Sequence, residues 1–139
     1  MAKKVIDVSE HQGKIDWEKV KDQIDGAILR CGYGMDQKNQ DDDYWSRNLS
    51  ECERLGIPIG VYLYSYADTE AKAKSELAHI LRLIKGHKFQ LPIFIDLEQS
   101  GTEGMAKKTA QIVCEGLKDA GYTQVGGQAV LGRQPSWST

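Results

Sequence analysis

The stretch LPIFIDLEQSG, residues 91–101, decides the fold because it joins an apolar run to two acids, Asp96 and Glu98. Successive side chains of a strand point to opposite faces, so these two acids share one face while Leu97 lies on the other. At a rise of about 3.3 Å per residue, their Cα atoms lie about 6.6 Å apart. The stretch therefore predicts a buried strand that holds two carboxylates side by side.

The paired acids have a functional and a structural interpretation. If water is partly excluded, each carboxylate shifts the protonation of the other, so that one stays ionised and the other holds a proton for acid–base chemistry. Acidic residues also often finish strands and cap the turn or helix after them. Asp7, a third acid at the end of an apolar run, favours the functional interpretation. A divalent cation is the weaker alternative, because only three acids and no nearby His are available. We expect no metal and no other cofactor.

Apolar runs alternate with helical patterns along the chain. Runs rich in Val, Ile and Tyr predict strands over residues 4–9, 26–34, 57–66, 91–98 and 122–127. Apolar residues at helical spacing predict a helix that Asp16 caps, a helix over 45–55 that Gly56 ends, and helices over 69–84 and 103–120. This alternation predicts an α/β protein with a parallel sheet and right-handed crossovers.

The length of the chain limits how such a sheet can close. An eight-stranded barrel needs on the order of 200 residues or more, whereas this chain has 139. We therefore expect either an open sheet or an incomplete parallel β/α barrel of the TIM type, with about five of eight strands, in a single domain. In both architectures functional groups lie at the carboxyl ends of the strands.

Polar side chains gather at those predicted strand ends. They are Asp7 and Ser9 on the first strand, Arg30 on the second, Tyr62, Tyr64 and Tyr66 on the third, and Asp96 and Glu98 on the fourth. The three tyrosines alternate, so their rings should face the same way. Such rings suit the apolar faces and rim hydroxyls of sugars, but a packed core with hydroxyls satisfied at its edge gives the same pattern. Both interpretations stay open for Tyr62 and Tyr64, whereas Tyr66 is interpreted as core packing.

Two other groups of residues carry weaker signals. Asp41–Asp43 lack the Gly and the terminal Glu of an EF-hand, so Asp42 is interpreted as a helix N-cap. His79 and His87 are expected on the surface, whereas His11 lies near the predicted rim and its role stays open.

Composition excludes several classes of partner. The net charge of −2 and the pI near 5.9 argue against nucleic acid or an anionic membrane held by bulk electrostatics. The N-terminus lacks the apolar run of a signal peptide, so we expect synthesis in the cytoplasm. An odd number of widely spaced cysteines predicts small buried hydrophobes, not disulfides or a zinc site: Cys31, Cys52 and Cys114.

Four segments together resemble one enzyme family: VIDVSEHQGKIDW (5–17), DDDYWSRNLSECERLGIPIGVYLYSYA (41–67), PIFIDLEQSG (92–101) and LKDAGYT (117–123). Their shared motifs are an Asp-x-Ser with a nearby Gln-Gly, an Asp-x-x-aromatic-x-x-Asn helix start, a Gly-x-Tyr-x-aromatic strand and an Asp-x-Glu strand end. Over about residues 4–123 the chain is similar to glycoside hydrolase family 25, the Chalaropsis-type lysozymes of phage endolysins and bacterial autolysins.

The resemblance implies a muramidase on a β/α barrel. Such enzymes cleave the β-1,4 bond between N-acetylmuramic acid and N-acetylglucosamine in peptidoglycan, during phage release or outside the cell. Carried onto matching positions, it makes Glu98 the general acid, Asp96 the group that stabilises developing positive charge, and Asp7 a further active-site carboxylate. A substrate-assisted route, in which the acetamido group attacks, fits two acids on one strand. The expected substrate-binding residues are Tyr62, Tyr64, Ser9, Gln12, Arg30 and Gln99.

The tail over 124–139 departs from the family pattern, and its composition suits a frameshifted or artificially ended reading frame. We therefore interpret residues 1–139 as a partial catalytic domain whose sheet edge is open, and a homo-oligomer could cover that edge. The alternative function is a catalytically inactive remnant that binds cell-wall glycan or depends on assembly with a second chain.

Overall fold

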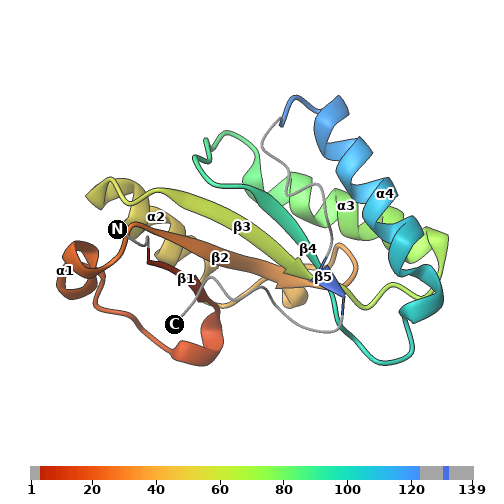
Figure 1. The fold of residues 1–139 in the computed structure, drawn as a ribbon, viewed down its shortest axis with the longest axis horizontal. Coiled ribbons are helices and arrows are strands. Elements are labelled where there is room, and N and C mark those ends of the chain that lie inside the picture. The colour runs from red at the N-terminus through yellow and green to blue at the C-terminus, as the bar shows by residue number, and fades with distance from the viewer. Residues whose placement is uncertain (1–3, 123–129, 132–139) are drawn as a thin grey trace.

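Five parallel strands lie side by side in the order in which they occur along the chain (Figure 1). The computed structural model describes residues 4–122 and 130–131. Within these residues the strands are β1 (Val5–Val8), β2 (Gly26–Tyr33), β3 (Ile59–Tyr64), β4 (Ile93–Leu97) and β5 (Val130–Leu131). The order has no reversal, as in an arc of a TIM-type barrel and unlike a doubly wound sheet. The predicted α/β class and parallel sheet are confirmed.

The fifth strand differs from the prediction. Tyr122 is outside any strand, because its backbone N–H donates to Leu117 O at 3.0 Å where the preceding helix ends. The rest of the predicted strand, residues 123–127, lies outside the described residues. Strand β5 instead comprises Val130 and Leu131, which pair with Asp96 and Leu97 of β4. In the part of the chain that the structure describes, β1 and β5 are the edges of the sheet.

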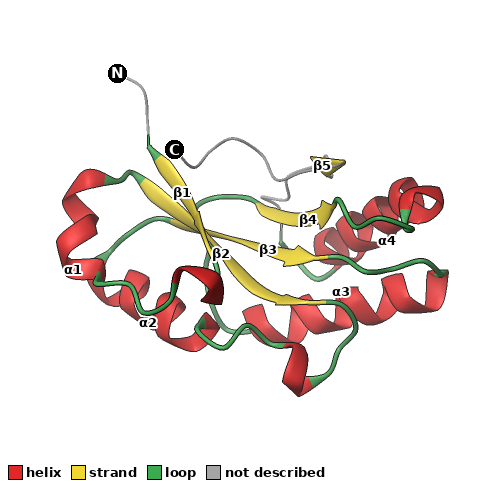
Figure 2. Cartoon of the chain, turned by 90° about the horizontal axis from the view of Figure 1, so that it is seen from below, coloured by secondary structure: helices red, strands yellow, loops and turns green. Residues whose placement is uncertain are grey.

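Helices connect the strands as the alternation predicts. In the described ranges the α-helices are α1 (Trp17–Val20), α2 (Trp45–Leu55), α3 (Glu70–Ile84) and α4 (Ala106–Asp119). Short 3-10 turns are η1 (Glu10–Gln12), η2 (Lys21–Gln23), η3 (Lys38–Gln40) and η4 (Glu103–Met105). Helices α2 and α3 cover the same side of the sheet (Figure 2), and α3 packs against α4. Among the helices of 4–122, none is long and apolar enough to cross a membrane.

The helix boundaries follow the capping signals of the sequence. Asp16 caps α1 by accepting a hydrogen bond from the backbone N–H of Lys19. Thr69 caps α3 in the same way, through Lys72. Gly56 ends α2 with φ of 71°, a left-handed conformation that favours glycine. These predicted ends are confirmed.

The main core lies between the helices and one face of the sheet. Its strand residues alternate along each strand with residues of the other face, and they include Val8, Leu29, Val61, Leu63 and Ile95. Cys31 and Cys52 belong to this core as predicted, and burial raises the pKa of the Cys52 thiol to about 12. Cys114 is only partly buried, and all three thiols are free.

Gly60 of the Gly-x-Tyr motif lies close to Ile28 of β2 and to the segment that leads into β4. A Cβ atom at this position would lie 2.5 Å from Pro92 O and 2.6 Å from Ile28 Cδ1. Both distances are below van der Waals contact, and the carbonyl belongs to backbone that cannot rotate away. The motif glycine is therefore a packing requirement of the sheet.

We expect Gly60→Ala to lower the free energy of unfolding by about 2 kcal/mol, because overpacking a dense interior costs about 1–3 kcal/mol. The control is Gly104→Ala in η4, where a Cβ atom would meet nothing within 4 Å. Urea denaturation followed by circular dichroism measures both variants. Equal stability of the two would show that the approach at Gly60 imposes no packing cost.

Candidate active site

The strand register brings the predicted rim residues to one face of the sheet. Arg30 is in register with Tyr62, and Tyr64 with Asp96. Asp7 is in register with Ile28, two residues before Arg30. Partners in neighbouring parallel strands point the same way, so these side chains share the face opposite the helix-covered core. Asp7, Arg30 and Asp96, which the sequence predicts at one rim of the sheet, thus lie on one face of it.

A cleft of about 400 Å³ opens at the carboxyl ends of these strands. Its lining includes every predicted site residue except Asp96 and Gln99, and it adds two residues to which the sequence assigned no binding role. The lining residues are Asp7, Ser9, His11, Gln12, Arg30, Tyr62, Tyr64, Tyr66 and Glu98. The mixture of carboxylates, a guanidinium and tyrosines suits a polar ligand with apolar faces, such as a carbohydrate.

The two acids of the opening stretch lie in different surroundings. Asp96 is the penultimate residue of β4 and is only 2% exposed. Glu98 follows the strand, is partly exposed and lines the cleft. Burial raises the pKa of the Tyr64 hydroxyl, and the negative charges of Glu98 and Asp96 raise it further. One acid is therefore accessible to a ligand, while the other is buried beside the same tyrosine.

Gln99 holds the ring of Tyr64 in place. The Tyr64 hydroxyl donates to Gln99 Oε1 at 3.0 Å, and Thr102 Oγ1 donates to the Gln99 carbonyl at 2.8 Å. In the structure Gln99 thus contacts a residue of the cleft lining, not the cleft itself. Its direct contact with substrate stays a prediction.

Ser9 and Gln12 form a capping box around η1. The Ser9 backbone N–H donates to Gln12 Oε1 at 2.7 Å, and the Ser9 hydroxyl accepts from the N–H of His11 at 3.2 Å. Such reciprocal bonds fix the turn that follows β1. The residues of the motif near Asp7 therefore shape the loop that follows β1, and they also line the cleft.

Arg30 is the centre of a buried ion-pair network. Its Nε lies 2.8 Å from Asp42 Oδ2, and its Nη2 lies 3.2 Å from Glu10 Oε1. Asp42 also accepts from the backbone N–H groups of Glu10 and Tyr44, both at 2.9 Å. The network joins η1, β2 and the loop before α2, so it fixes one wall of the cleft.

The prediction that Asp42 is a helix N-cap is wrong. Tyr44 is the N-cap of α2, and its side chain makes no capping hydrogen bond, while Asp42 lies two residues earlier and accepts from the Tyr44 N–H in the turn before the helix. The physical reason is the buried guanidinium of Arg30, whose charge must be paired, and Asp42 supplies the carboxylate. Sequence spacing could not indicate Arg30 as the partner, because Arg30 lies on β2, 12 residues before Asp42.

Tyr66 and His11 enlarge the predicted site. Tyr66 is 46% exposed and lines the cleft, so its interpretation as core packing is wrong. The reason is that β3 ends at Tyr64, which leaves Tyr66 in the loop beyond the sheet. His11 is exposed at the cleft, and this settles its location near the rim.

Two buried polar side chains of helix α3 form hydrogen bonds with the loops that border the cleft. Glu76 accepts from Ser65 Oγ at 2.6 Å and from the backbone N–H of Tyr66 at 2.8 Å. His79 places Nδ1 2.9 Å from Gly34 O and Nε2 2.8 Å from Asp41 Oδ1. One helix thereby holds the loops that follow β2 and β3.

The predicted surface location of His79 is wrong, because its side chain is completely buried. His87 is partly exposed and pairs with Glu53. Glu76 and His79 lie three and six residues after the buried Ala73, on the buried side of α3. That helical spacing was the signal that could have placed them inside.

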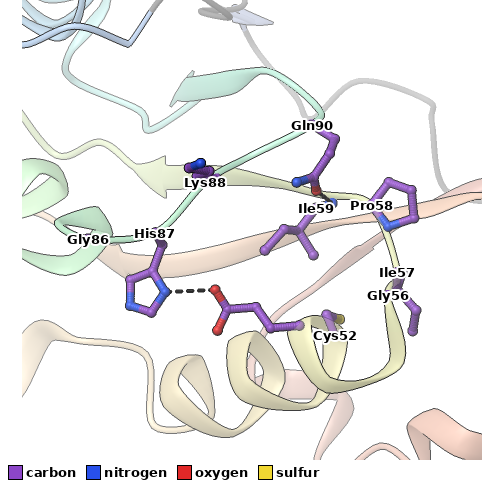
Figure 3. Close-up of a pocket in the computed structure, with 10 residues that line it drawn as sticks. Cys52, Gly56, Ile57, Pro58, Ile59, Gly86, His87, Lys88 and Gln90 are labelled. Atoms are coloured by element: carbon purple, nitrogen blue, oxygen red, sulfur yellow. Dashed lines mark hydrogen bonds and ion pairs between the residues drawn. The ribbon is translucent and has the colours of Figure 1, made fainter.

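A second and larger cavity, of about 550 Å³, lies at the opposite ends of the strands (Figure 3). It is formed by the end of α2, the start of β3 and the segment after α3. Three of its polar side chains are paired, whereas Lys88 also lines it: His87 Nδ1 lies 2.8 Å from Glu53 Oε2, and Gln90 Oε1 accepts from the N–H of Ile59. We therefore place the chemistry in the smaller cleft, at the carboxyl ends.

Metal ligation finds no support in the part of the chain that is described, where no group of three or more His, Cys, Asp or Glu side chains could hold an ion. The absence of a metal centre otherwise stays a prediction.

Comparison with known proteins identifies the family. The family model for glycosyl hydrolases family 25 matches residues 6–127. The modular autolysin LytC from Streptococcus pneumoniae shares 36% sequence identity with a TM-score of 0.76, over 88% of this chain and 31% of that chain. This chain belongs to glycosyl hydrolases family 25, which confirms the resemblance. No curated protein sequence matches the chain.

More distant solved structures share the fold. A family 25 glycosyl hydrolase from Bacillus anthracis is 22% identical with a TM-score of 0.73, over 86% of this chain and 56% of that one. The lysozyme of Streptomyces coelicolor is 20% identical with a TM-score of 0.69, over 94% of this chain and 62% of that one. The chain thus spans between about a third and two thirds of the length of these relatives.

Glu76 predicts a pH dependence of stability. Burial raises the pKa of this carboxyl above 4.5, although its bonds to Ser65 and Tyr66 oppose the shift. The folded state therefore keeps a proton that the unfolded state has lost, so the free energy of unfolding falls as pH rises from 4.5 through the raised pKa. We expect Glu76→Gln to remove the decrease in the free energy of unfolding that is due to Glu76, because the amide does not titrate.

Urea denaturation of the wild type and Glu76→Gln, below and above the ordinary glutamate pKa, measures the difference. The matched control is Glu115→Gln, an exposed glutamate of α4, which should keep the wild-type slope. If both variants keep that slope, Glu76 is ionised in the folded state throughout this range.

Proposed function

We propose that the protein is a peptidoglycan hydrolase that cleaves the β-1,4 bond between N-acetylmuramic acid and N-acetylglucosamine. The observation that carries the proposal is the accessible Glu98 beside the buried Asp96 in a tyrosine-lined cleft of a family 25 domain. The pneumococcal relative is an autolysin whose structure is also described in complex with a synthetic peptidoglycan ligand. The site of action is then the bacterial cell wall.

The surroundings of the acids support distinct roles. Glu98 faces the cleft, so it is the general acid that protonates the leaving oxygen of the glycosidic bond. Asp96, buried at the end of β4, supplies negative charge where the oxocarbenium-like carbon develops. Asp7 adds a third carboxylate across the cleft.

A substrate-assisted route suits this arrangement. In that route the acetamido oxygen of the substrate attacks the anomeric carbon, and the proton of Glu98 passes to the leaving oxygen. Asp96 then stabilises the positive charge on the acetamido nitrogen. Ser9, Gln12, Arg30, Tyr62 and Tyr64 would bind the sugar rings around this centre.

Glycan binding without cleavage is the alternative. The chain spans 31% of the pneumococcal autolysin, and we propose that it is a partial catalytic domain whose sheet edge a second copy could cover. Binding and turnover must therefore be measured separately.

We expect Glu98→Gln to lower turnover of purified cell walls by at least about a hundredfold while folding and glycan binding persist, because the amide keeps the shape of the acid but has no proton to give. Glu103→Gln, an exposed glutamate five residues further on, is the matched control. If the Glu98→Gln variant kept more than about a tenth of the wild-type rate, the substitution would have removed less than about 1.4 kcal/mol of transition-state stabilisation. That is too little for the proton donor of this reaction, and the assignment of Glu98 would be given up.

Asp96→Asn should also slow cleavage, since it removes the charge that stabilises the developing cation. Because the proposed mechanism uses carboxylates alone, EDTA should leave the wild-type rate unchanged. Loss of activity with EDTA and its recovery with added divalent ion would instead indicate a metal-assisted reaction.

A further inference from the structure

Three tyrosines form a cluster at the cleft, of which two line it and Tyr33 packs against Tyr66: Tyr33, Tyr64 and Tyr66. The ring centroids of Tyr64 and Tyr66 are 5.2 Å apart, and those of Tyr33 and Tyr66 are 6.1 Å apart in an edge-to-face arrangement. Tyr66 is the one large apolar side chain in the described part of the chain that is exposed, and it lies on the cleft. Two members of the tyrosine cluster, Tyr64 and Tyr66, therefore line the same cleft as the carboxylates.

A β-bulge in β2 brings Tyr33 into the cluster. The register passes from Arg30 opposite Tyr62 to Gly32 opposite Leu63, so β2 carries one extra residue at this point. Regular alternation would place Arg30 and Tyr33 on opposite faces, but the bulge sets Tyr33 opposite Tyr64. The Arg30 guanidinium accordingly lies 5.3 Å from the centre of the Tyr33 ring.

The backbone beneath the Tyr66 ring is held in place. The N–H of Tyr66 donates to the buried Glu76, and the N–H of Ser65 donates to Asp96 O at 2.9 Å. On the other side, the N–H of Gly34 donates to Tyr64 O at 2.9 Å. An exposed aromatic ring on a fixed backbone loses little conformational freedom when it binds a ligand.

We propose that Tyr66 is a carbohydrate platform that stacks on the apolar face of a sugar ring of the glycan strand, next to the sugars that Glu98 acts on, and so favours longer glycans. The inference rests on the proposed function. A sugar fits better than a charged ligand, because Arg30, the cation of this wall, is already paired with Asp42 and Glu10. A flat ring matches the axial C–H face of a pyranose, and this stacking needs no charge.

The test measures binding in the full chain carrying Glu98→Gln, so that the ligand survives. The probe is a soluble octasaccharide of alternating N-acetylglucosamine and N-acetylmuramic acid, and calorimetry gives the affinity. We expect Tyr66→Ala to weaken binding about three- to tenfold, whereas Tyr66→Phe, which keeps the ring, binds as well as the parent. Tyr66→Leu should lose as much as Tyr66→Ala, which separates a flat ring from apolar area.

Tyr44→Ala is the matched control, a partly exposed tyrosine that does not line the cleft, and it should bind as the parent does. Circular dichroism checks that each variant is folded. Unchanged octasaccharide affinity in Tyr66→Ala and Tyr66→Leu would overturn the inference. Weakened binding of an isolated stem peptide, with octasaccharide binding intact, would also overturn it in favour of a peptide site.

Cleavage by the chain without the Glu98 substitution separates the two proposals. If that chain cleaves peptidoglycan but Tyr66→Ala does not change octasaccharide affinity, only the platform fails. If it does not cleave but the octasaccharide binds through Tyr66, the hydrolase proposal fails and the platform stands. In an active chain, Tyr66→Ala should raise KM for the octasaccharide by a larger factor than it lowers kcat, because the platform binds a sugar beside the cleaved bond and not the reacting atoms.

Discussion

The parallel register of β2, β3 and β4 is the constraint on which the rest of the structure depends. It places Leu29, Val61 and Ile93 on one face, where the helices bury them. The same pairing forces the alternate residues onto the other face, where they meet at one rim. Core and cleft are thus two consequences of one hydrogen-bond pattern. A shift of the strand register by one residue would turn the core side chains to the cleft face and the cleft side chains to the core face.

Much of this arrangement could be predicted from local signals. The strand that leads to Asp96 and Glu98 is short and apolar, and Thr69 and Gly56 carry clear signals for a helix start and a helix end. These features depend on neighbours within a few residues in the chain. The convergence of Asp7 with Glu98 required only the general rule that parallel strands present their carboxyl ends together.

Two of the errors concern partners that are distant in sequence. Asp42 pairs with Arg30 of β2, and His79 contacts Asp41, 38 residues earlier. The bulge after Arg30 has no local signature, because it arises from how two strands match one another. A buried charge such as Arg30 requires compensation, and removing one member of such a pair costs about 3 kcal/mol or more. Periodicity can show that a polar side chain is buried, but it cannot show which group will form its hydrogen bond or ion pair.

Helix α3 gives the cleft a property that its lining residues alone do not have. Because Glu76 and His79 bond the loops after β3 and β2, these loops cannot open independently of the helix. Local unfolding of this region should therefore be cooperative, with the amides of the loops and of α3 exchanging with solvent in a single event. The binding surface then behaves as one foldon, and its rigidity is a property of the helix behind it.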